Sequence, residues 1–180
     1  MLLTGRVREG LTNWGTHVID GMRFVLDDPE TVWVMGAVER RTDRYERDTM
    51  TEDCCMGLIT FAGGVQAQIQ SDLEEEGASA GFFQIRGSEG MLEATEHRVR
   101  LFNVGSGGWT DVEEGGERRS IGGETNAAQV RELVVWIEGG PEHRGSGRKA
   151  RATVEETAYP IDLMIAEGKL PVEAEGRYDI

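Results

Sequence analysis

The segment Leu11-Thr-Asn-Trp-Gly-Thr-His-Val-Ile-Asp-Gly-Met-Arg-Phe-Val-Leu26 decides the fold, because it reads as an amphipathic helix that carries a polar stripe. Residues at positions i, i+4 and i+7 share one face of an α-helix, so we expect Asn13, His17 and Asp20 to line up. Apolar residues recur at helical spacing on the remainder and are expected to pack against a core: Trp14, Val18, Ile19, Met22, Val25 and Leu26. The polar stripe therefore faces away from that packing surface.

The ends of this helix are predicted from capping residues and proline. Thr12 and Asn13 are both good N-caps, so the helix is expected to begin near them. Proline disfavours helix in the residue before it, so the helix is expected to end before Asp27-Asp28-Pro29.

A series of strands is predicted to follow. The β-branched, aromatic or alternating runs that indicate strands are residues 32–39, 55–61, 65–73, 82–86, 91–94 and 99–102. Ala62-Gly63-Gly64 and Gly87-Ser-Glu-Gly90 are short turns between such runs, so each predicts an antiparallel hairpin. In residues 65–70, apolar side chains alternate with glutamine, which indicates one buried and one polar face.

The remaining segments are predicted as loops and helices. Residues 40–53 read as an exposed excursion or a frayed strand end, and residues 105–123 as a mobile loop or irregular strands. Residues 126–138 are predicted as a helix closed by Gly139-Gly140-Pro141. A third helix is expected over residues 152–166, interrupted by Pro160.

This order of elements, one helix, five or six strands and two helices, predicts a single α+β domain over residues 1–180. We expect a large, predominantly antiparallel (mixed) sheet with helices packed on one face. The other face would carry the apolar side chains Trp33, Met35, Phe82 and Phe83, so homodimerisation through this open face is a hypothesis.

Composition narrows the possible partners. The net charge of −14 argues against nucleic acid or an anionic membrane as a partner. Cys54 and Cys55 are adjacent, so a disulfide between them would be strained and they are expected to be free thiols of a reducing compartment. No apolar run is long enough for a membrane span and no signal-peptide pattern stands at the start, so a cytoplasmic location is expected.

Five motifs in order resemble a known family. They are Asn-Trp-Gly-Thr-His-Val-Ile-Asp at 13–20, Trp-Val-Met-Gly at 33–36, Glu-Asp at 52–53 before Gly-Leu-Ile-Thr-Phe-Ala-Gly-Gly at 57–64, Ile-Arg-Gly-Ser-Glu-Gly at 85–90 and Ile-Ala-Glu-Gly-Lys-Leu-Pro-Val at 165–172. Together they resemble the C-terminal domain of the glucose-fructose oxidoreductase / inositol dehydrogenase (Gfo/Idh/MocA) family, over about residues 10–172.

The resemblance implies a substrate-binding and dimerisation half of an NAD(P)-dependent sugar or polyol oxidoreductase. In the family pattern Asp-x-Gly-x-His-x-x-Asp, His17 would be the acid/base residue, and Asn13 and Asp20 would support it or contact substrate. Asn13 replaces the first aspartate, and an amide cannot carry a proton. The sequence has no Gly-x-Gly-x-x-Gly fingerprint and no preceding Rossmann domain, so the chain alone is expected to bind no cofactor and to lack redox activity. NAD(P) would belong to the full-length family, and a separate Rossmann-domain chain is a possible partner.

Two other functions remain open. The chain would be a stand-alone ligand-binding or interaction module if His17 were dispensable. It would be a cofactor-independent hydrolase or lyase if histidines, carboxylates or a metal acted together, although no pair has metal-ligand spacing. Solvated or structural roles, rather than catalytic ones, are expected for the remaining polar candidates: His97, His143, residues 144–151, Tyr159, Glu52 and Asp53.

Overall fold

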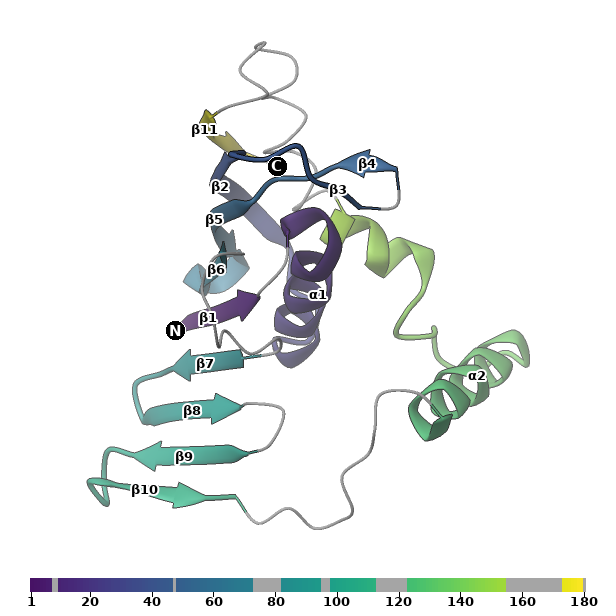
Figure 1. Ribbon diagram of the computed structural model, residues 1–180. Helices are drawn as coiled ribbons and strands as arrows, with labels where there is room; N and C mark the ends of the chain where they lie inside the picture. The colour runs from purple at the N-terminus through teal and green to yellow at the C-terminus, as the bar shows by residue number, and fades with distance from the viewer. Residues whose placement is uncertain are drawn as a thin grey trace.

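The computed structural model describes residues 1–7, 10–46, 48–72, 82–94, 98–112, 123–154 and 173–179. Within these residues, nine strands form one sheet in the order β10-β9-β8-β7-β1-β6-β5-β2-β11 (Figure 1). The strands are β1 Leu2–Val7, β2 Thr31–Glu39, β5 Cys54–Phe61, β6 Gln66–Asp72, β7 Phe82–Arg86, β8 Gly90–Ala94, β9 Val99–Asn103, β10 Gly108–Asp111 and β11 Glu173–Asp179. β1 and β6 pair in parallel, and the other neighbours pair antiparallel. The predicted α+β fold with a predominantly antiparallel, mixed sheet is confirmed.

Both predicted hairpins are present. β5 and β6 pair around the turn at Ala62–Gly64, where Gly63 and Gly64 have φ values of 83° and 80° that favour glycine. β7 and β8 pair through the turn that begins at Gly87. Ala67 and Ile69 of β6 are buried while the neighbouring glutamines are more exposed, which confirms the expected alternation.

The strand count and the first element were predicted wrongly. The chain begins with β1, which lies in the middle of the sheet between β6 and β7. Its partners lie more than sixty residues away in the sequence, so no local hairpin signal marks it. β10 lies in residues 105–123, which were predicted as a mobile loop or irregular strands, and β11 was missed. These two strands extend the two ends of the sheet.

The described helices lie outside the sheet. A π-helical turn, η1 (Leu11–Gly15), leads into α1 (Thr16–Val25), and α2 spans Gly123–Ile137. A further helical stretch covers residues 147–154, and the rest of the predicted third helix, with Pro160, falls outside the described residues. Gly139, with φ of 91°, follows α2 as the predicted glycine stop. No helix in the described ranges is long and apolar enough to cross a membrane.

The core forms where α1 covers one face of the sheet (Figure 1). Val18, Ile19 and Met22 are buried against the strands, as predicted. The fit against β1 is close, because a Cβ added to Gly5 would lie 2.3 Å from Val18 Cγ1 and 2.4 Å from the Met22 methyl carbon. Glycine at position 5 is therefore what lets α1 approach the sheet.

Residues 40–53 differ from the exposed excursion that was expected. β3 (Tyr45–Glu46) and β4 (Thr49–Met50) form a small two-stranded sheet there. The next three residues, Thr51, Glu52 and Asp53, are buried. The carboxylates of Glu52 and Asp53 accept hydrogen bonds that the sequence pattern does not reveal.

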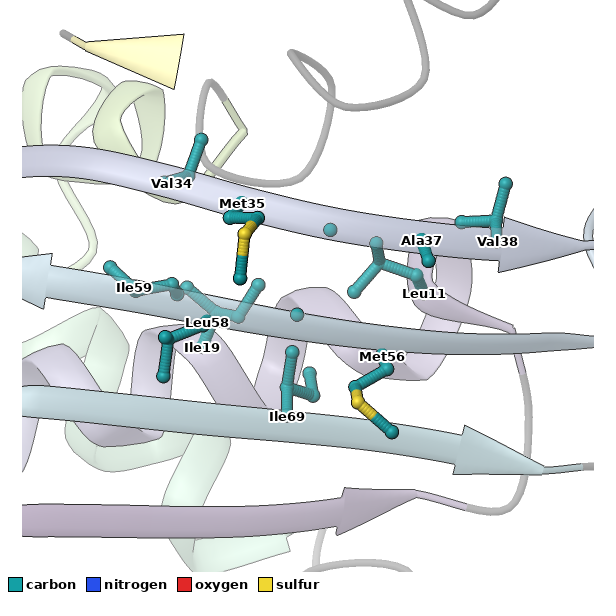
Figure 2. A pocket seen from close by; sticks show the side chains of 12 residues that line it. Leu11, Ile19, Val34, Met35, Ala37, Val38, Met56, Leu58, Ile59 and Ile69 are labelled. Carbon is teal, nitrogen blue, oxygen red and sulfur yellow. The ribbon is translucent and has the colours of Figure 1, made fainter. Parts of the chain in front are cut away.

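A small apolar cavity lies where Gly36 of β2 pairs with Gly57 of β5 (Figure 2). The two glycines leave room between the strands, and the lining residues come from β2, β5, β6 and the helix. Its volume is about 10 Å³, which is room for one water at most. This cavity is too small and too apolar to be a ligand site.

Candidate functional site

The helix that carries the predicted site begins differently from the prediction. In η1, the Gly15 N–H donates to the Gly10 carbonyl at 3.2 Å, which is the i to i+5 bond of a π-turn. The residue at the N-cap of η1 is Gly10, so the helix begins before Thr12 and Asn13. Instead, the Glu52 carboxylate accepts a hydrogen bond from the Leu11 N–H, at the end of the helix where a negative charge is favourable. Glu52 is 6% exposed, so a buried residue of a distant segment anchors this helix start.

The π-turn holds an extra residue, so side chains before it are rotated relative to those of α1. Trp14 was expected in the core, but it is 38% exposed and contacts His17 edge-on, with ring centroids 5.5 Å apart. Val25, at the other end of α1, is exposed as well and was also predicted wrongly. Leu26 is partly buried against the core, as expected.

A cleft of about 580 Å³ lies between α1, α2 and the segment that follows α2. Its volume is within the range of small-molecule sites. Its described lining consists of His17, Asp20, Gly21, Arg23, Phe24, Asp27, Asp28, Ala128, Gln129, Glu132, His143, Arg144, Gly145 and Lys149. The structure thus brings His17 and Asp20 together in one cleft, and Asn13 is not among these lining residues.

Ion pairs stabilise the wall of the cleft on both sides. Arg23 is buried and donates to Asp28 Oδ1 at 2.7 Å, to Thr31 Oγ1 and to the Pro29 carbonyl, which fixes the turn after α1. Arg144 pairs with Glu132 of α2 and places its guanidinium 5.4 Å from the centre of the Phe24 ring. These pairs connect the loop after α2 to both helices.

A hydrogen bond connects α1 with the helical stretch at residues 147–154. Thr153 Oγ1 donates to Asp20 Oδ1 at 3.4 Å, which connects residues 133 positions apart in the sequence. His17 is exposed and Lys149 is half-buried. A ligand in the cleft would meet an imidazole, a carboxylate and an ammonium group, a set suited to hydroxyl and carbonyl oxygens.

His143 was expected to be solvated, and the structure places it in the wall of the cleft instead. Its Nδ1 accepts a hydrogen bond from the Gly145 N–H at 3.1 Å, while its Nε2 is buried without a hydrogen-bond partner. The solvated loop expected at residues 144–151 is also partly wrong, because the Arg144 pairs and the helical stretch that begins at 147 order part of it. His97 and Tyr159 lie outside the described residues.

Glu52 and Asp53 contact different segments of the chain. The Asp53 carboxylate accepts bonds from the Arg41 N–H and from the Thr42 N–H and hydroxyl, the last two at 2.7 and 2.6 Å. Burial acts to raise the pKa of Asp53, but these hydrogen bonds outweigh it, so the pKa is below its usual value. Both carboxylates hold loops and helix ends in place.

The cysteines are free thiols, as predicted. Burial raises the pKa of Cys55 to about 12, so this thiol is not a nucleophile at neutral pH. Within the described ranges, no three His, Cys, Asp or Glu side chains are grouped so that they could hold a metal ion.

Solved structures with the same fold are parts of larger oxidoreductases. The chain superposes on an NAD-binding oxidoreductase from Klebsiella pneumoniae with a TM-score of 0.71 at 14% identity, covering 99% of this chain and 57% of that one. It superposes on an Agrobacterium radiobacter oxidoreductase, solved with NAD+, L-tartaric acid and magnesium, with a TM-score of 0.68 at 16% identity, covering 99% and 55%. For levoglucosan dehydrogenase in complex with NADH and levoglucosan, the TM-score is 0.67 at 15% identity, covering 97% and 58%. The chain therefore spans little more than half the length of these structures.

A family model also matches part of the sequence. Residues 8–93, slightly less than half of the chain, match the model described as the GFO/IDH/MocA C-terminal domain. This confirms the resemblance on which the site residues were predicted. A search of curated proteins finds no significant match.

Proposed function

We propose that the chain is the substrate-binding and dimerisation half of an NAD(P)-dependent oxidoreductase of sugars or polyols. The observation that carries the proposal is the placement of His17 and Asp20 in one cleft of about 580 Å³ on the outer side of α1. His17 would exchange a proton with the reacting hydroxyl, because a neutral imidazole is the side chain best suited to this near pH 7. Asp20 would accept a hydrogen bond from a ligand hydroxyl, and Asn13 would support the turn before His17.

We propose that the cofactor is bound by residues other than these 180. The sequence contains no Gly-x-Gly-x-x-Gly, so these residues do not fit a dinucleotide and we assign no step of hydride transfer to them. A nucleotide-binding domain, on the same or a separate polypeptide, would supply the nicotinamide. The oxidoreductases with this fold whose structures contain NAD+ or NADH are nearly twice as long as this chain.

The uncovered surface of α2 supports a missing partner of this kind. Side chains along α2 that are at least 38% exposed are Val130, Leu133, Val134, Val135, Trp136 and Ile137. Phe24 and Val25 of α1 are exposed as well. This many exposed apolar side chains on one helix favours a surface that another domain covers. We propose that the nucleotide-binding domain covers it, which would place the cofactor beside the cleft.

The open face of the sheet is proposed as the dimer interface. One row of paired residues crosses eight strands on this face: Met35, Leu58, Gln68, Thr4, Gln84, Glu93, Arg100 and Asp111. Met35 and Met56 are exposed at one end of the face, and ion pairs such as Arg100 with Glu93 lie towards the other. Light scattering after size exclusion would report a dimer, and Met35→Asp with Met56→Asp would give a monomer. A wild-type monomer at micromolar concentration would refute this part.

The central experiment compares the wild-type chain with His17→Ala and Asp20→Asn in ligand and cofactor titrations. We expect the wild-type chain to bind a sugar or polyol weakly, both variants to bind it more weakly, and none of the three to bind NADH tightly. Tight NADH binding by the chain alone would contradict the proposal. Ligand binding that is unchanged in His17→Ala would instead favour a stand-alone binding module. The free thiols fit a reducing compartment, and we propose a cytoplasmic location on that ground.

A further inference from the structure

Among the lysine and arginine side chains that line the cleft, Lys149 is the one without an ion pair in the described part of the chain. The other two are neutralised by carboxylates, because Arg23 pairs with Asp28 and Arg144 pairs with Glu132. Lys149 is also half-buried, so bulk water solvates its charge less fully than that of a surface lysine. Its ammonium group is therefore open to a counter-charge that a ligand would bring.

The position of Lys149 in its helix does not explain this charge. Lys149 lies in the first turn of the helical stretch at residues 147–154, and its N–H donates to the Ser146 hydroxyl at 3.4 Å. A positive charge is unfavourable at this end of a helix, because the backbone N–H groups there already make it positive. The nearby Glu142 carboxylate accepts the Ser146 hydroxyl at 2.7 Å and lies 3.9 Å from Arg148. The ammonium group thus does not stabilise the helix, which indicates another role.

The helical stretch directs Lys149 towards α1. Lys149 and Thr153 are four residues apart, so they lie on the same face of this helix. Thr153 Oγ1 donates to Asp20 Oδ1 at 3.4 Å, which shows that this face is turned towards α1. Lys149 lines the same cleft as His17 and Asp20. One wall of the cleft therefore supplies an ammonium group, and the wall formed by α1 supplies an imidazole and a carboxylate.

We propose that Lys149 binds the carboxylate of a polyhydroxylated acid, such as an aldonate, while His17 and Asp20 face the hydroxyls of the same molecule. The inference rests on the proposed function, because it narrows the substrate class of the same site. A hydrogen bond between an ammonium group and a carboxylate is roughly twice as strong as one between neutral groups. A neutral polyol leaves the charge of Lys149 without a counter-charge, so the cleft selects the acid.

The acidic residues of the cleft determine which end of the ligand lies where. Asp20 and Asp27 are the lining carboxylates for which the described residues provide no ion pair, and they belong to α1 and the turn after it. A carboxylate accepts hydrogen bonds from hydroxyls and repels an anion, so the hydroxyl end belongs at Asp20 and the acid end at Lys149. The net charge of −14 opposes every anion, but salt screens charges more than about 8 Å away, so the contact with Lys149 dominates.

Titration of the full chain with gluconate and glucitol tests the inference. These two linear six-carbon compounds differ only at one end, where gluconate has a carboxylate and glucitol a hydroxymethyl group. Binding is followed by the amide signals of the ¹⁵N-labelled chain. We expect the Kd of gluconate to be lower than that of glucitol by about five- to tenfold, and this preference to shrink at high salt. Acetate, which has no hydroxyls, should bind more weakly than gluconate.

Variants separate a contact with Lys149 from a general effect of charge. Lys149→Gln should raise the Kd of gluconate about five- to tenfold and that of glucitol by less, whereas Lys149→Arg should keep the preference for the acid. Arg148→Gln is the matched control, because it removes the same charge from the same helical turn. The side chain of Arg148 is 85% exposed and does not line the cleft, so neither Kd should change in this variant. A dispersed amide spectrum verifies that each variant is folded.

The outcomes distinguish this inference from the proposed function. The inference is refuted if gluconate and glucitol bind the wild-type chain equally, or if acetate binds as tightly as gluconate. It is also refuted if Lys149→Gln and Arg148→Gln weaken gluconate binding to the same extent. In each of these cases the proposed function stands as long as His17→Ala weakens glucitol binding. If neither gluconate nor glucitol shifts any signal of the site, both proposals are overturned.

Discussion

Gly5 controls how closely α1 approaches the sheet, and its replacement by alanine should be strongly destabilising. The added Cβ would lie 2.3 Å from Val18 Cγ1 and 2.4 Å from the Met22 methyl carbon, whereas ordinary carbon contacts begin near 3.5 Å. Both neighbours are buried and cannot turn towards solvent. The helix must therefore move outward by roughly 1 Å, and overpacking of this kind costs about 1–3 kcal/mol.

Urea unfolding of Gly5→Ala should show this loss of free energy of unfolding with an unchanged m-value, and the melting temperature should fall by about 2–12 °C. Gly108→Ala is the matched control, because position 108 is also a strand glycine with no heavy atom within 4 Å of an added Cβ. Its effect should be within about 0.5 kcal/mol. Trimming the obstructing side chain with Met22→Ala should make Gly5→Ala less harmful in the double variant than in the single one. Equal stability of Gly5→Ala and wild type would refute the close-packing argument.

Three further predictions concern the buried polar groups. Glu52→Ala removes the acceptor of the Leu11 N–H and should lower the free energy of unfolding by about 1–3 kcal/mol. Hydrogen exchange of the amides at the start of η1 should become faster. Unchanged hydrogen exchange there would contradict the role of Glu52 as a helix cap. At pH 8, a thiol reagent should modify Cys54 in the native chain and both cysteines in urea, because burial raises the pKa of Cys55 to about 12. Two fast-reacting thiols in the native chain would contradict this prediction. Folding lowers the pKa of Asp53, so its charge stabilises the fold above about pH 4, and this contribution is lost as the pH falls through the folded pKa. Asp53→Asn should therefore make the free energy of unfolding depend less on pH on the acid side. An unchanged pH dependence would contradict the contacts of Asp53 with Thr42 and Arg41.

The elements that the sequence predicted are those with local signals. The hairpins at residues 62–64 and 87–90 combine glycine turns with alternating strands, and both formed with the expected partners. β1 has neither signal, since its two partners are supplied by distant parts of the chain. Contacts between distant segments are decided by the whole fold, and a single sequence shows no trace of them.

The site was predictable only in part, because local helix periodicity places some of its residues and contacts between distant segments place the others. His17 and Asp20 are three residues apart within α1, so their common cleft follows from helix periodicity. Asn13 and Trp14 lie within the π-turn, and helix periodicity and capping patterns in the sequence do not predict an extra residue in a turn. His143 and Lys149 enter the site only because the segment after α2 returns to α1, which is a tertiary effect.

The position of His17 therefore depends on contacts that do not belong to the cleft. Glu52, a buried residue 41 positions from Leu11, holds the start of the π-turn, and the absence of a side chain at Gly5 sets the distance between α1 and the sheet. A shift of α1 at either point would move the imidazole relative to Asp20's partner Thr153, which lies on a different helical stretch. Because the side chains of a binding site tolerate displacements of well under 1 Å, substitutions at Gly5 and Glu52 should weaken the proposed ligand binding as well as stability. Loss of binding in these variants at temperatures where they remain folded would separate this positional effect from unfolding.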